Sequence, residues 1–135
     1  RALARLGANW FSHPADKMTM IGVTGTNGKT SITYLLKTVL EQTLGAKVGL
    51  IGTIQNMIGT EVIHTGRTTP ESFELQKLFA QMADAGCTHC VMEVSSHALV
   101  LHRADEISFE TGIFTNLTPT ARQKQCSLPD AGTAW

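Results

Sequence analysis

The chain has 135 residues, which is enough for one domain with a sizeable hydrophobic core. Its 11 Lys and Arg balance its 11 Asp and Glu, so charge gives no reason to expect binding to nucleic acid or an anionic membrane. No apolar run approaches the roughly 20 residues of a spanning helix, and three cysteines predict no disulfide framework. We expect a cytoplasmic monomer. Because the chain opens on Arg1 without a signal peptide, we also expect a fragment or excised domain.

Residues 1–17 are expected to form a helix end and a linking loop, with Leu3, Leu6, Trp10 and Phe11 as candidates for packing inward. Residues 20–23 then form a short apolar, β-prone run that predicts a buried strand. A glycine-rich turn follows, and an amphipathic helix begins near Lys29 and ends at Gly45. The predicted buried stripe of this helix is Ile32, Leu35, Leu36, Val39 and Leu40.

The turn, G-T-N-G-K-T, has the features of an anion-binding loop. Its glycines let several backbone N–H groups converge, and the following helix adds the positive end of its dipole. Lys29 is expected to reach the β- and γ-phosphates and Thr30 to ligate Mg²⁺. The strict G-x-x-x-x-G-K-[ST] pattern is not met, because Val23 stands where its first glycine belongs and Gly25 replaces it. A mere tight turn is the alternative, but it leaves the Lys-Thr pair unexplained.

Later segments alternate between strand and helix patterns. Strands are predicted at 47–54, 61–64, 89–94, 107–109 and 111–115, the first two as a hairpin at a sheet edge. A helix is predicted from a Thr69 cap to about Ala85, and a short one through Arg103. The buried side of the longer helix is predicted to be Phe73, Leu75, Leu78, Phe79 and Met82. This alternation predicts an α/β fold, a mostly parallel sheet with helices on both faces.

Ligands of such sheets bind at the carboxyl ends of the strands. Residues 24–30, residues 93–97 and Asn116 all lie at such ends, which predicts one site. Glu93 ends an otherwise apolar strand, and a carboxylate there is costly unless a cation such as Mg²⁺ compensates it.

Two further patterns have ordinary explanations. Cys87 and Cys90 form a C-x-x-C without a second pair, and Cys90 begins an apolar strand, so we expect core thiols rather than a metal site. His97 follows two serines, but no G-x-S-x-G motif surrounds them, so a helix-start role is favoured over a catalytic base.

Four segments together resemble the central domain of the Mur ligases, nearest to the UDP-N-acetylmuramoyl-tripeptide synthetase (MurE) type. They are GVTGTNGKT (22–30), RTTPE (67–71), MEVSSHALVLHR (92–103) and GIFTNLT (112–118). The first motif alone is shared with folylpolyglutamate synthetases and the other Mur enzymes. E-V-S-S-H-A-L narrows the resemblance to the MurE type, with cyanophycin synthetase-like proteins next. By this resemblance, residues 18–118 are a partial central ATP-binding domain.

The resemblance implies an ATP-dependent amide-bond ligase of peptidoglycan precursor synthesis. Such an enzyme activates the D-glutamate carboxylate of a UDP-muramoyl peptide as an acyl phosphate, which a third amino acid then attacks. Lys29 and Glu93 would be catalytic, with Thr30 and Glu93 at the metal. Residues implied to contact the UDP-muramoyl peptide are Thr68, Thr69, Ser95 and Arg103. Residues implied to bind ATP are Gly25, Thr26, Asn27, Gly28, Lys29, Thr30 and Ser31.

The chain departs from the family pattern after Thr118. The family continues with D-H-L-D-x-H and later a carbamylated lysine, whereas here Ala121 stands where the first His is expected. We interpret residues 119–135 as a disordered tail produced by a frameshift or an artefact of how the chain was made. Two functions stay open: the central domain of an ATP-dependent ligase, inactive alone, or a non-catalytic nucleotide-binding fragment.

Overall fold

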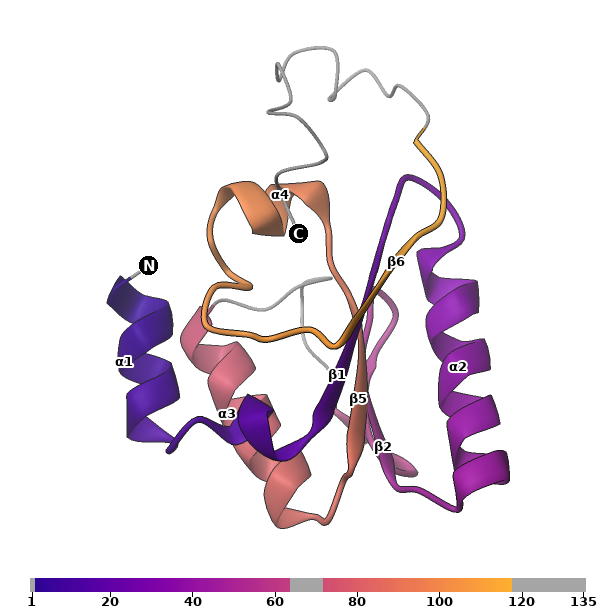
Figure 1. The fold of residues 1–135 in the computed structure, drawn as a ribbon, viewed down its shortest axis with the longest axis horizontal. Helices are drawn as coiled ribbons and strands as arrows, with labels where there is room; N and C mark the ends of the chain where they lie inside the picture. Colours follow the sequence, from indigo (N-terminus) through magenta and orange to yellow (C-terminus); the bar gives the residue numbers. More distant parts are fainter. Residues whose placement is uncertain (1, 64–71, 118–135) are drawn as a thin grey trace.

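A computed structural model of the chain describes residues 2–63 and 72–117 (Figure 1). Within those residues, six strands form one sheet in the order β4-β3-β2-β5-β1-β6. None of the described helices is long and apolar enough to cross a membrane. The strands are β1 (Thr19–Thr24), β2 (Val48–Ile51), β3 (Asn56–Ile58), β4 (Glu61–Ile63), β5 (His89–Glu93) and β6 (Thr111–Phe114). The helices are α1 (Ala2–Trp10), α2 (Lys29–Leu44), α3 (Ser72–Asp84) and α4 (Ser96–Val100), with a 3-10 turn at Pro14–Lys17.

The sheet is mostly parallel, as the sequence predicts. Strands β2, β5, β1 and β6 run parallel to one another, whereas β3 is antiparallel to both β2 and β4 and forms a hairpin with β4 at one edge. A hairpin does lie at the sheet edge, but the predicted pairing of 47–54 with 61–64 is wrong, because β4 pairs with β3. The second strand ends at Ile51, and a separate strand, β3, lies between it and β4. The strand predicted at 107–109 is wrong, since these residues lie outside any strand.

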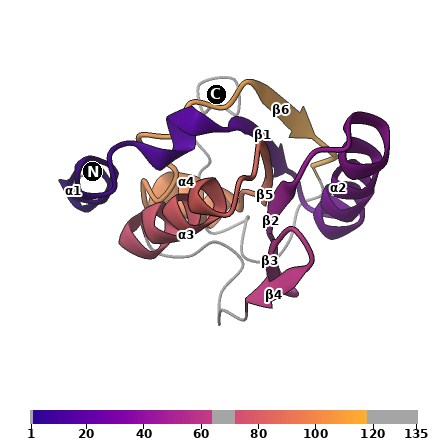
Figure 2. The ribbon, with the colours of Figure 1, turned by 90° about the horizontal axis from the view of Figure 1, so that it is seen from below.

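Helices cover both faces of the sheet, with α2 alone on one face and α1, α3 and α4 on the other (Figure 2). Side chains alternate between the two faces along each strand. On β5, Cys90 and Met92 join the cluster under α3, whereas Val91 packs on the α2 side with Val23 of β1. This alternation matters for the site, because Glu93 has the parity of Val91 and therefore belongs to the α2 side.

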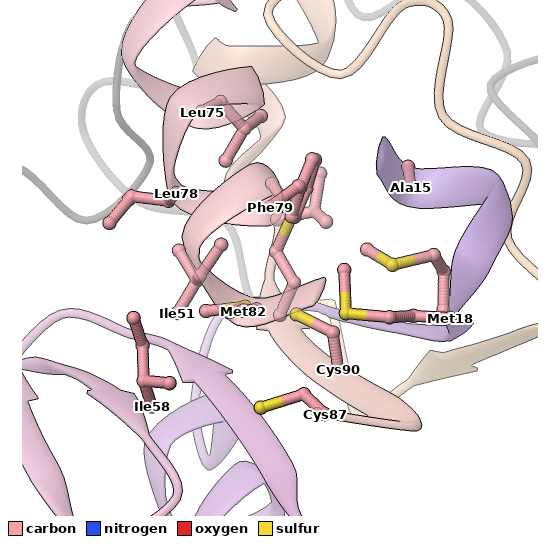
Figure 3. Close-up of a cluster of buried hydrophobic side chains, with 13 residues drawn as sticks. Ala15, Met18, Ile51, Ile58, Leu75, Leu78, Phe79, Met82, Cys87 and Cys90 are labelled. Atoms are coloured by element: carbon pink, nitrogen blue, oxygen red, sulfur yellow. The ribbon is translucent and has the colours of Figure 1, made fainter. Parts of the chain in front are cut away.

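The larger core lies between the sheet and α3 (Figure 3). Leu75, Phe79 and Met82 of α3 are fully buried there, and Leu78 is nearly so. Four of the five predicted core positions are thus confirmed, while Phe73 is partly exposed and contacts the Phe11 ring instead. After α3, Gly86 adopts φ 89 while the Cys87 and Gly86 N–H groups bond back to the last helical turn, which is how the predicted glycine ends the helix. The predicted cap at Thr69 lies outside the described residues.

The buried side of α2 differs from the predicted stripe. Leu35 and Val39 are exposed, whereas Thr33 and Lys37 are buried. The helix is rotated so that the row Thr33–Lys37 faces the sheet, flanked by the partly buried Ile32, Leu36 and Leu40. Lys37 tolerates burial because its ammonium group is paired with Glu41, one helical turn further on. A pattern of apolar residues alone could not reveal this pairing.

The amino-terminal segment contains the helix α1 and then a turn, in line with the predicted helix and linking loop. Leu3, Leu6 and Trp10 are exposed, so their predicted packing is wrong. The small residues Ala4, Gly7 and Ala8 face α3 instead. A Cβ on Gly7 would lie 3.2 Å from Gln76 of α3, so small residues allow the two helices to approach closely.

Candidate nucleotide-binding site

The G-T-N-G-K-T turn joins the carboxyl end of β1 to the amino end of α2, as predicted. Strand β1 ends at Thr24 and α2 begins at Lys29. Gly28 caps the helix in the left-handed conformation, with φ 84 and ψ 1, and the helix begins with the Ile32 N–H bonded to the Gly28 carbonyl at 3.1 Å. The first N–H groups of a helix have no partner within it and carry the positive end of its dipole. Asn27 and Gly28 are exposed, so this end of the loop is open to a ligand.

The Lys29 side chain lies along the loop. Its Nζ donates a hydrogen bond of 2.7 Å to the carbonyl oxygen of Gly25, and the residue is half-buried. The ammonium group therefore stays next to the loop backbone rather than extending into solvent. Thr30 and Ser31 follow in the first turn of α2, Thr30 half-buried and Ser31 exposed. This places one cation and the start of a helix at the same end of the sheet.

The end of β6 holds the other side of the loop, which the sequence did not identify. The Asn116 side chain accepts from the Asn27 N–H at 3.0 Å and donates to the Asn27 carbonyl at 3.1 Å. The Thr115 hydroxyl donates to the same carbonyl at 2.7 Å. The Asn116 carbonyl accepts from the Thr26 N–H at 2.9 Å. The sequence predicts Asn116 at a strand end of the site, but its contact with the loop follows only from the adjacency of β6 and β1.

Glu93, the last residue of β5, is fully buried at the same end of the sheet. The Thr53 hydroxyl, in the turn after β2, donates to its Oε2 at 2.6 Å. Gly52 also lies beside this carboxylate, since a Cβ there would be 3.0 Å from Glu93 Oε1. Thr53 was missed by the sequence analysis because the strand was predicted to run to residue 54, whereas β2 ends at Ile51 and leaves Thr53 just beyond its carboxyl end.

The carboxylate oxygens of Glu93 suit Mg²⁺, because Mg²⁺ is usually bound through one or two carboxylates and keeps several waters. A buried carboxylate held by a hydroxyl, on the face of the sheet that carries α2, is the kind of ligand expected beside a triphosphate. Among the described residues, no group of three or more His, Cys, Asp or Glu is arranged to hold a metal. The single buried carboxylate of Glu93 fits a metal whose other ligands are phosphate oxygens and waters.

The residues implied to contact the peptide substrate lie near α4. The Ser95 hydroxyl accepts from the Ala98 N–H at 3.1 Å and so caps α4. His97 lies in the first turn of that helix and is exposed. Arg103 follows in the turn after α4 and is partly buried. Its backbone N–H donates to the Ala98 carbonyl at 2.9 Å. Thr68 and Thr69 lie outside the described residues.

Both cysteines of the C-x-x-C are buried in the α3-side core. Burial raises the pKa of Cys87 and, more strongly, that of the fully buried Cys90. A raised thiol pKa keeps sulfur protonated and unreactive. The two thiols belong to the core of the sheet.

Fold and loop define an α/β domain of the P-loop type, and comparison with known proteins narrows the class. The Mur ligase middle domain family matches residues 23–120. The chain belongs to this family. It is 56% identical over 117 residues to the UDP-N-acetylmuramoyl-L-alanyl-D-glutamate–2,6-diaminopimelate ligase of Caldanaerobacter subterraneus subsp. tengcongensis. It is 58% identical over 118 residues to ligase 1 of the same name from Clostridium acetobutylicum.

A solved structure of a UDP-N-acetylmuramoyl-L-alanyl-D-glutamate–2,6-diaminopimelate ligase is also similar, with a TM-score of 0.75 and 28% identity. That match covers 87% of this chain and 25% of the solved one. The two curated relatives are matched over 87% of this chain and 24% of their own length. The chain therefore spans about a quarter of the proteins it resembles.

Proposed function

We propose that this chain is the ATP-binding part of an ATP-dependent ligase that adds the third amino acid to UDP-N-acetylmuramoyl-L-alanyl-D-glutamate in peptidoglycan precursor synthesis. The observation that carries the proposal is the loop of residues 25–28, whose open end meets the start of α2 with Lys29 alongside. The names of the relatives at 56% and 58% identity support the substrate and favour diaminopimelate as the amino acid. We infer action as a monomer in the cytoplasm.

The chemistry joins two anions, the triphosphate and a carboxylate. The γ-phosphoryl group passes to a carboxylate oxygen of D-glutamate and ADP leaves with the electron pair of the broken P–O bond. The amine then attacks the acyl carbon, phosphate departs, and the amine loses a proton. Such transfers depend on positioning and on neutralising negative charge. In this chain the donors are the N–H groups at the start of α2 and the Lys29 ammonium.

Thr30 and Glu93 would hold Mg²⁺, which supplies positive charge to the phosphate oxygens when it is bound. The Thr53 hydroxyl fixes the orientation of the Glu93 carboxylate. Ser95, Arg103, Thr68 and Thr69 would face the UDP-muramoyl peptide. The role of Ser95 as the cap of α4 is compatible with this, since the capped helix end lies directly after Glu93 in the chain.

These 135 residues alone should bind ATP without catalysing ligation. Holding an acyl phosphate and an amine in reactive geometry is worth about 7–11 kcal/mol. A chain that spans a quarter of its relatives is not expected to supply it. The alternative, a non-catalytic nucleotide-binding fragment, makes the same prediction for this chain but not for a full-length protein that contains it.

The test is a calorimetric titration of the chain with Mg·ATP, beside a phosphate-release assay with UDP-muramoyl dipeptide and candidate amino acids. We expect saturable ATP binding that Lys29→Ala weakens by about tenfold or more, since hydrogen bonds to charged groups contribute about 1.5–3 kcal/mol. Lys77→Ala, on the distant helix α3, is the matched control and should bind as the unaltered chain does.

Absence of saturable ATP binding would contradict the proposal. Substrate-dependent phosphate release by the chain alone would show that residues not recognised here complete the catalytic site. A full-length protein with this segment should release phosphate only when both the UDP-muramoyl peptide and the amino acid are present.

A further inference from the structure

Residue 116 makes an unusual set of contacts for an exposed side chain. Its side-chain amide bonds to both the N–H and the C=O of Asn27, and its backbone carbonyl accepts from the Thr26 N–H. The Thr115 hydroxyl adds a fourth bond, again to the Asn27 carbonyl. These bonds span 88 to 90 positions of sequence and converge on two consecutive residues of the glycine loop. An amide that satisfies a backbone N–H and C=O together imitates a strand partner.

The N–H groups of the loop therefore fall into two sets, one that bonds to the protein and one that is left for a ligand. Thr26 and Asn27 direct theirs to residue 116, so these two donors are committed to the protein. The donors left to face an anion are those at the open end, from Gly28 into the first turn of α2. With residues 26 and 27 anchored, the chain must turn at Gly28, where φ is 84.

We propose that Asn116 is a positioning residue of the phosphate-binding loop: with Thr115, it fixes residues 26 and 27 so that the N–H groups at the start of α2 face the ligand. The inference rests on the proposed function and names a contact that the sequence motifs do not assign. The pairing of β6 with β1 makes this contact possible, since the register places Phe114 opposite Thr24 and carries the next two residues to the loop.

The experiment measures ligand affinity and loop anchoring separately in the full 135-residue chain. The ligand is Mg²⁺ with inorganic tripolyphosphate, which probes the phosphate site without a base or sugar. Anchoring is measured as the hydrogen-exchange rate of the Asn27 N–H by NMR without ligand. The variants are Asn116→Ala, which removes both side-chain bonds, and the pair Thr115→Val and Thr115→Ser, of which only Ser keeps the hydroxyl.

The matched control is Ile113→Ala. This side chain lies on the same strand and packs on the α2-side core, but no hydrogen bond to the loop depends on it. It should lower the thermal midpoint without changing tripolyphosphate affinity. Asn116→Ala should weaken tripolyphosphate binding about tenfold and accelerate Asn27 exchange by a similar factor, as expected for lost hydrogen bonds. Thr115→Val should show a smaller change of both, and Thr115→Ser should restore them.

Two results would overturn the proposal: an Asn116→Ala variant with unaltered affinity and exchange, or an Ile113→Ala variant that weakens binding as much. If the unaltered chain fails to bind tripolyphosphate while Asn116→Ala still accelerates Asn27 exchange, the proposed function fails and the anchoring by Asn116 stands. The two failures are thus distinguishable.

Discussion

The two glycines of the loop differ in what surrounds them. Gly25, at the end next to β1, has φ 134, and a Cβ there would lie 2.1 Å from the Thr115 hydroxyl and 2.9 Å from the Asn116 carbonyl. Gly28, at the end next to α2, has φ 84, and a Cβ there would meet no atom of the described residues within 4 Å. One glycine is required by the neighbouring strand, the other only by the direction in which the chain must turn.

This difference separates the part of the loop that the protein holds from the part that is open to a ligand. The crowded end fixes the backbone, and the open end presents N–H groups at the start of a helix. Substitutions of Gly25 and Gly28 alter one end at a time, and substitutions of Thr53 and Glu93 test the neighbouring carboxylate. They are ordered from the largest expected loss of stability to the smallest.

Gly25→Ala should be the most damaging change. It forces an L-residue into a conformation that side chains avoid and drives a methyl group into β6. Strain and overpacking each cost about 1–3 kcal/mol, so the free energy of unfolding should fall by about 3 kcal/mol or more, measured by denaturant titration. ATP binding should be lost with it. Unchanged stability would mean that β6 does not press on the loop.

Thr53→Val should cost about 1–3 kcal/mol of unfolding free energy. The substitution keeps the shape of the side chain but removes the hydroxyl that donates to the buried Glu93 carboxylate. Thr53→Ser keeps the donor and serves as the control. Equal stability of the Val and Ser variants in denaturant titration would show that the hydroxyl does not hold Glu93.

Gly28→Ala should cost only about 1–2 kcal/mol, the penalty of a left-handed residue with a Cβ. Since no atom of the described residues lies within 4 Å of this Cβ, the added methyl group would occupy space on the ligand side, and affinity for Mg·ATP should fall further than stability does. Thermal unfolding with and without ATP measures both. A Gly28→Ala variant as unstable as Gly25→Ala would erase the distinction between the two ends.

Glu93→Gln should change stability least, since glutamine keeps the shape and can still accept the Thr53 hydrogen bond. Its effect should appear in the ligand instead: the gain in ATP affinity that Mg²⁺ provides should decrease about tenfold, while affinity without Mg²⁺ is retained. Calorimetry at several Mg²⁺ concentrations tests this. An unaltered dependence on Mg²⁺ would remove Glu93 from the metal site.

Much of this arrangement follows from the sequence, because local patterns specify the elements. The β1–loop–α2 unit, the glycine-ended helix α3 and the apolar strand β5 were predicted from periodicity and turn residues. The errors occurred where burial depends on a specific partner. Lys37 is buried because Glu41 neutralises it, and the apolar residues of α1 are exposed because its small residues make the contact with α3.

The site was predictable in its position but not in its internal contacts. Polar residues at the carboxyl ends of parallel strands are expected to lie close together, and this rule predicted that Glu93 and the loop share one site. The bonds from Thr53 to Glu93 and from Asn116 to Asn27 join segments 40 and 89 positions apart. Such contacts depend on strand order, which places β6 beside β1 and β5 between β1 and β2.

We claim that the N–H groups at the start of α2 bind the phosphates of ATP. The most direct test is a titration of the isotopically labelled chain with Mg·ATP, followed through its amide NMR signals. The account predicts saturable shifts that are largest for the N–H groups of residues 28–31, with smaller changes at Thr26 and Asn27, whose N–H groups stay bonded to residue 116. Saturable shifts centred elsewhere on the sheet, or no saturable shifts at all, would contradict it.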